Sequence, residues 1–181
     1  KCLELALNNG VSMTTGKALG PALGDLARYH TYDQVETALM GQAEAAAALL
    51  TDKIRLEEIR TALLRPQPML SLFVEDCVEK AEDLSAYGAR YSSVGVRMPG
   101  LAAVSDSLTA LRTLCFEEKA CTEDSRERLS GEGKGEIFGR FSGERILHGL
   151  RTNFEDDAIL RDALINRAPK YGNDADRADQ T

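Results

Sequence analysis

The stretch from residue 31 to residue 64 contains no proline and is rich in alanine, the residue with the highest helix propensity. Thr31 or Asp33 can cap a helix at its start. Apolar side chains then recur at helical spacing, at Val35, Leu39, Ala43, Ala46, Leu50, Ile54 and Ile59. The pattern predicts one long helix, or two helices with a break near Thr51-Asp52, in a mostly helical chain.

Prolines and glycines set the limits of the neighbouring elements. Pro66 and Pro68 end the long helix, because neither residue can donate a backbone hydrogen bond. The stretch 11–30 contains several glycines and few periodic apolar positions, which predicts an irregular surface loop. Apolar periodicity predicts further helices over the ranges 3–7, 69–82, 101–116, 144–153 and 156–166.

Two segments depart from the helical period. Residues 87–100 alternate small and apolar side chains among three glycines, which favours extended strands or a loop buried against other backbone. Residues 123–143 are polar and glycine-rich, and this composition predicts a flexible insertion.

The composition narrows the class of protein and its partners. The chain has 181 residues, of which 43% are hydrophobic and 28% charged, as in ordinary globular domains. Its net charge of -7 argues against nucleic acid as a partner, because that affinity depends on clustered Lys and Arg. No apolar run approaches the ~20 residues of a membrane span, and no leader pattern opens the chain. We therefore expect a soluble, cytoplasmic protein with no membrane contact.

Residue spacing gives no catalytic or metal-binding constellation. The four cysteines show no Cys-x-x-Cys spacing, and both histidines lie far from them in sequence, so reduced structural thiols and no metal are expected. Gly16-Lys17 lacks the remaining residues of a phosphate loop. The acid pairs Glu57-Glu58, Glu117-Glu118 and Asp156-Asp157 lie on amphipathic segments, where charged residues usually form a solvated face.

Three blocks of sequence carry a resemblance to a known family. The first is residues 1–10 with Thr15-Gly16-Lys17, Leu19-Gly20-Pro21 and Gly24-Asp25. The second comprises residues 68–72, 76–80, 88–91, 100–102 and 106–108. The third comprises residues 153–155, 160–161 and 168–174 with Asp179. In this order the blocks resemble glycyl radical enzymes of the pyruvate formate-lyase type, and more closely the group that contains glycerol and choline lyases and arylacetate decarboxylases.

The resemblance implies both a fold and a chemistry. The fold is α/β, a ten-stranded α/β barrel of which residues 1–181 would form a mostly helical part. A glycyl radical, installed by an S-adenosylmethionine-dependent activase, would generate a cysteine thiyl radical. That radical would cleave a C–C, C–O, C–N or C–S bond of a small-molecule substrate, in a lyase, dehydratase, decarboxylase or formate C-acetyltransferase. The full-length enzyme would be a homodimer.

Neither radical-bearing motif occurs in this chain. It contains no Gly-Cys-x-Glu and no Arg-Val-x-Gly-Tyr sequence. We therefore expect an internal piece of such an enzyme, with no catalytic residue and no bound cofactor of its own, inactive alone. Cys77 falls at helical spacing with Phe73 and Lys80 and resembles an ordinary helix position of the family. The alternative is a non-catalytic helical interaction module derived from that family.

The resemblance also implies which residues face the substrate. Family segments that follow the Gly-Ala-Arg-Tyr sequence, here residues 88–91, descend toward the barrel interior. The candidate substrate-binding residues are therefore Tyr91, Ser92, Ser93, Val94, Val96 and Met98. Plain core packing of the apolar residues among them is the alternative. Two departures from the family occur nearby, with Tyr87 at a position that is usually glycine and Ser92 at one that is often Asn.

Overall fold

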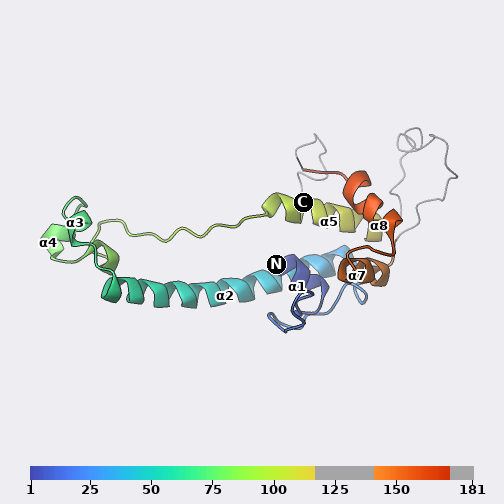
Figure 1. Ribbon diagram of the computed structural model, residues 1–181, viewed down its shortest axis with the longest axis horizontal. Coiled ribbons are helices and arrows are strands. Elements are labelled where there is room, and N and C mark those ends of the chain that lie inside the picture. The colour runs from blue at the N-terminus through green and yellow to red at the C-terminus, as the bar shows by residue number, and fades with distance from the viewer. Residues whose placement is uncertain (117–140, 172–181) are drawn as a thin grey trace. The chain divides into compact units, whose positions relative to one another are not determined.

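The computed structural model describes residues 1–116 and 141–171 of the chain (Figure 1). It divides into two compact units, one formed by Lys1–Ala43 and Pro99–Thr181 and the other by Glu44–Met98. We refer to them as unit 1 and unit 2. No helix in the described residues is both long enough and apolar enough to span a membrane.

The described residues are mostly helical and contain no β-strand. Two isolated antiparallel bridges join Asn8 to Asp25 and Val11 to Ala18. The longer helices are α1 (Cys2–Leu7), α2 (Tyr32–Leu64), α5 (Leu101–Leu111), α7 (Gly143–Arg151) and α8 (Ala158–Asp162). Short elements are α3 (Pro68–Ser71), α4 (Cys77–Lys80) and the 3-10 turn η1 (Leu84–Ala86), and π-helical turns extend α5 as η2 (Arg112–Phe116) and α8 as η3 (Ala163–Arg167).

Helix α2 is continuous, so the possible break near Thr51-Asp52 does not occur (Figure 1). The Thr51 hydroxyl donates to the Ala47 carbonyl at 2.9 Å and so stays within the helix. The buried residues of α2 are Val35, Ala38 and Gln42, all in its first part. In unit 1 this part of the helix packs against the core.

The core of unit 1 joins the first helix to the C-terminal helices. Its buried cluster includes Leu7, Leu26, Val35, Leu111, Phe141, Ile146 and Leu160. The Phe141 amide donates to the Leu114 carbonyl at 2.9 Å, and Phe141 is 6% exposed. The packed structure therefore resumes at Phe141, before the end of the insertion expected at 123–143. Residues 123–140 of that segment lie outside the described residues.

The single helix predicted over 69–82 is wrong. Two short helices, α3 and α4, occupy this range instead. Asp76 adopts a left-handed conformation with φ of 73° immediately before α4, and Ala81 does so with φ of 53° where α4 ends. Asp76 also forms an ion pair with Arg90 at 2.8 Å, a contact between residues far apart in sequence. This contact stabilises the break, and local periodicity does not reveal it.

Side-chain caps fix the starts of the last two α-helices. The Ser142 hydroxyl accepts a hydrogen bond from the Arg145 amide at 3.2 Å, and the Asp157 carboxylate accepts one from the Leu160 amide at 3.0 Å. These helices therefore lie close to the predicted ranges 144–153 and 156–166. The segment 87–100, predicted as strands or a buried loop, pairs with no strand among the described residues and is largely exposed.

A candidate functional site on unit 2

The six predicted substrate-binding residues lie in the extended segment that follows η1. Their side chains are exposed, with Tyr91 at 89% and Met98 at 77%. Ser92 and Val94 line a groove of about 350 Å³ within unit 2. Tyr91, Ser93, Val96 and Met98 are not among the residues that line it. The structure thus brings two of the six predicted residues into one concave site.

One face of α2 forms the opposite wall of this groove. Its lining side chains recur every three or four residues, the spacing at which residues share a helix face: Leu50, Lys53, Ile54, Glu57, Glu58 and Thr61. Leu84, Ser85 and Tyr87 complete the lining from η1 and the residue after it. The groove therefore combines apolar walls with ammonium, carboxylate and hydroxyl groups, the composition typical of small-molecule sites.

Asp83 holds the second wall in place. One oxygen of its carboxylate accepts hydrogen bonds from the Gln67 backbone amide at 2.9 Å and from the Ser71 hydroxyl at 3.0 Å. The other accepts from the Ser85 amide at 2.9 Å and the Ser85 hydroxyl at 2.6 Å. These donors, led by the Ser85 hydroxyl, lower the pKa of Asp83 to about 2. The ionised carboxylate therefore fixes η1 relative to α3.

Tyr87 lines the groove and is about half exposed. It follows η1 with φ of 68°, in the left-handed region. Glu58, which lines the same groove, is the main cause of a raised Tyr87 pKa. Sequence reasoning missed both residues as site candidates, because Glu58 belonged to an apparently solvated acid pair. The one signal available was Tyr87 at a position that is usually glycine in the family.

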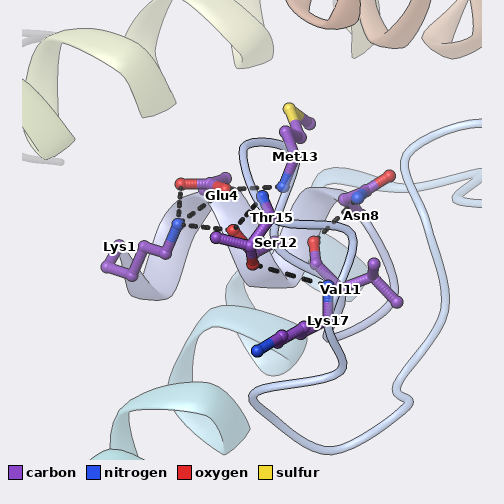
Figure 2. Close-up of polar contacts among 8 residues, drawn as sticks. All are labelled: Lys1, Glu4, Asn8, Val11, Ser12, Met13, Thr15 and Lys17. Carbon is purple, nitrogen blue, oxygen red and sulfur yellow. Dashed lines mark hydrogen bonds and ion pairs between the residues drawn. The ribbon is translucent and has the colours of Figure 1, made fainter.

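The first family block forms a separate network in unit 1 (Figure 2). Glu4 on α1 accepts hydrogen bonds from the Lys1 ammonium and the Met13 amide, each at 2.8 Å. The Lys1 ammonium also donates to the Ser12 hydroxyl at 2.9 Å. The Lys1 hydrogen bond is the main cause of a lowered Glu4 pKa. Figure 2 shows the loop after α1 folded over that helix by these contacts.

An apolar cavity of about 330 Å³ lies beside this network. Its polar lining groups are Glu4 and Ser107. The Ser107 hydroxyl donates to the Ala103 carbonyl at 2.7 Å, so both groups have internal partners. The cavity therefore offers apolar surface and no reactive group, and the groove on unit 2 is the stronger candidate site.

The described cysteines give no reactive constellation. Cys2 and Cys77 are free thiols, and Cys77 and Cys115 are buried. No group of three or more metal-ligating side chains occurs within residues 1–116 and 141–171. Cys121 lies outside the described residues.

Comparison with known proteins identifies the family. A family model described as pyruvate formate lyase-like matches residues 1–181. The trans-4-hydroxy-L-proline dehydratase of Clostridioides difficile is 30% identical over 99% of this chain and 20% of its own length. The (2S)-3-sulfopropanediol dehydratase of Klebsiella oxytoca is also 30% identical, over 99% of this chain and 19% of its own length. The chain thus spans about a fifth of the length of these relatives.

Solved structures agree with this assignment. The crystal structure of the C. difficile hydroxyproline dehydratase with its substrate bound has a TM-score of 0.83 at 30% identity, over 99% of this chain and 20% of that one. A glycyl radical enzyme from Archaeoglobus fulgidus has a TM-score of 0.77 at 31% identity, over the same shares. The chain belongs to the pyruvate formate lyase-like family of glycyl radical enzymes.

Proposed function

We propose that the full-length protein is a glycyl radical enzyme that eliminates or cleaves a group from a small-molecule substrate, breaking a C–C, C–O, C–N or C–S bond. The observation that carries this proposal is the match along the whole chain to two dehydratases at 30% identity. Relatives with other reactions match as well, among them an isethionate sulfite-lyase and a 4-hydroxyphenylacetate decarboxylase glycyl radical subunit. Dehydration is therefore the first reaction to test.

The part that we assign to this chain is a wall of the substrate pocket in a ten-stranded α/β barrel. Support comes from the groove on unit 2, where Ser92 and Val94 lie opposite the Lys53 and Glu58 positions of α2. Ser92 and Lys53 can bind substrate oxygens, while Val94 excludes water beside them. A radical intermediate requires such exclusion, because water and stray hydrogen donors divert it into side reactions. Tyr91, Ser93, Val96 and Met98 would contact substrate or barrel residues outside the groove.

The radical groups themselves would come from outside this chain. When present, a glycyl radical would supply the unpaired electron for a cysteine thiyl radical, and the thiyl radical would start the reaction. The chain has neither the cysteine motif nor the glycine motif. We therefore assign to its residues substrate binding and water exclusion, and to the full-length homodimer, after treatment by an activase, the reaction itself.

The test uses the full-length protein and this chain side by side. Each is incubated anaerobically with an activase and S-adenosylmethionine, and electron paramagnetic resonance is recorded. The full-length protein should give a glycyl doublet and convert at least one of trans-4-hydroxy-L-proline, glycerol, 1,2-propanediol and isethionate. The 181-residue chain should give no signal. A doublet from the chain alone, or a full-length protein without a radical, would contradict the proposal.

A further inference from the structure

The part of α2 that belongs to unit 2 carries a row of exposed apolar side chains. Leu49, Leu56 and Leu63 lie seven residues apart on the continuous helix, and Ile59 shares their face (Figure 1). Each of the four is between 60% and 75% exposed, and no residue of α2 after Gln42 is buried. We refer to these four residues as the apolar row. Contiguous exposed apolar side chains of this kind mark an interaction surface.

Basic side chains border the apolar row on both sides. In the heptad notation of paired helices the row occupies a and d positions, Lys53 and Arg60 occupy e positions, and Arg55 occupies a g position. Lys53 and Arg55 form no ion pair within residues 1–116 and 141–171. Arg60 pairs with Glu57 across an exposed contact of 3.5 Å. The row therefore lies between cationic flanks.

These flanks disfavour a second copy of the same helix as the partner. In a parallel pair the e positions of one helix face the g positions of the other, and in an antiparallel pair like positions face each other. Either arrangement would bring Lys or Arg of one copy against Lys or Arg of the other. A helix with an apolar face and acidic flanks would form ion pairs on both sides instead, so charge complementarity specifies that partner.

The full-length protein can supply this partner within one polypeptide. The chain spans about a fifth of the length of the relatives that it matches. A segment of the same polypeptide acts at a much higher effective concentration than a separate protein does. Asp52 occupies a d position within the row, and a single polar group at such a position fixes the register of the partner helix.

We propose that the apolar row of α2 is the docking surface for a helix of the full-length protein from outside these 181 residues, with an apolar face flanked by Asp and Glu. The inference rests on the proposed function in one respect, that this chain is part of a longer enzyme. The neighbouring face of the same helix lines the groove through Leu50, Lys53 and Ile54. Docking at the row would therefore also hold one wall of the candidate substrate site in place.

The experiment measures how fast a cysteine in the row reacts with dithiodipyridine. Leu56→Cys is made in the 181-residue chain and in the full-length protein, and the modified residue is identified by peptide mass spectrometry. The thiol should react on the order of tenfold or more slowly in the full-length protein, because the docked helix covers it. Leu63→Cys repeats the measurement at a second position of the row. Thr51→Cys is the control, since Thr51 is exposed on another face of α2 and should react alike in both proteins.

Charge reversal tests the acidic flanks of the partner. In full-length Leu56→Cys the further change Arg55→Glu should accelerate the reaction about fivefold, because it sets a carboxylate against the acidic flank. Arg65→Glu makes the same change of charge just after α2, at neither an e nor a g position, and should leave the rate unaltered. Equal acceleration by both variants, or by neither, would show that the partner has no acidic flank and would overturn the inference.

Three further outcomes would also overturn it. Equal rates for Leu56→Cys in the two proteins would mean that nothing in the full-length protein covers the row. Equal protection of Thr51→Cys would mean that the whole helix is buried and that the row is no distinct surface. Protection that is lost on dilution would make a second copy or a separate protein the occupant. The glycyl radical signal is measured independently of these rates, so failure of the proposed function is distinguishable from failure of this inference.

Discussion

At the scale of single residues, the half-buried Asp83 organises the contacts around η1. Four donors converge on its carboxylate from Gln67, Ser71 and Ser85. Its pKa is lowered from 3.8 to about 2 in the folded chain. Because the folded value is the lower one, the carboxylate stabilises unit 2 fully above about pH 4 and progressively less as the pH falls toward 2.

The loss of stability in unit 2 at low pH can be followed through the reactivity of the nearby Cys77 thiol. It is buried in α4, and we expect its reaction with dithiodipyridine to accelerate as the pH falls from 4 to 2, with products assigned by peptide mass spectrometry. Asp83→Asn should show the accelerated reaction already at neutral pH, because an amide offers one acceptor oxygen where the carboxylate offers two. Cys115 in unit 1 is the internal control. Equal Cys77 reactivity in both proteins across this pH range would contradict the assignment.

Gly20 is a second residue whose identity is set by a close contact, because no Cβ fits there. The side-chain amide of Gln42 donates to the Pro21 carbonyl at 2.7 Å. A Cβ at Gly20 would overlap Oε1 of the same Gln42 side chain. Gln42 is 2% exposed, so it has little room to move. Gly20→Ala should cost about 1–3 kcal/mol of unfolding free energy, measured by urea denaturation. Gly95→Ala meets open space and has no positive φ, so an equal loss there would show that the Gly20 contact is unimportant.

At the scale of elements, Phe141 begins the segment that packs the last helices onto the core. It is buried among core residues, and the Arg145 guanidinium lies 4.9 Å from its ring centroid. Phe141→Ala should cost about 3–5 kcal/mol of unfolding free energy, because it leaves a cavity in the core. Phe73→Ala is the matched control, since Phe73 is 84% exposed and its change should be within about 0.5 kcal/mol. Similar losses in both variants on urea denaturation would rule out this packing role.

The predictable elements are those whose signals are local. The range 31–64 is one helix because its apolar period and alanine content lie within it and two prolines follow. The range 69–82 was predicted wrongly because its interruption involves the Asp76 ion pair with Arg90. The groove escaped prediction for the same reason. Glu58 and Tyr87 line the same groove only because η1 packs beside α2, and nothing in the sequence around either residue indicates that packing.

At the scale of the whole molecule, unit 2 depends little on buried apolar surface. From Glu44 onward α2 has no buried residue, and Leu49, Leu56 and Leu63, seven residues apart, are exposed. A helix gains most of its stability from packing an apolar face, so this arrangement leaves a row of leucines without a partner in the described residues. The chain spans about a fifth of the length of its relatives. Activity tests of site residues therefore belong in the full-length protein.

Val94 and Val96 provide the sharpest such test. Both are about half exposed, and Val94 lines the groove whereas Val96 does not. In the activated full-length enzyme, Val94→Phe should lower kcat/KM on the order of tenfold or more while the glycyl radical signal persists, because the larger ring fills the groove. Val96→Phe should have the smaller effect. A larger effect at Val96 would mean that the substrate contacts the other side of the segment, and unchanged kinetics in both variants would remove residues 91–98 from the substrate site.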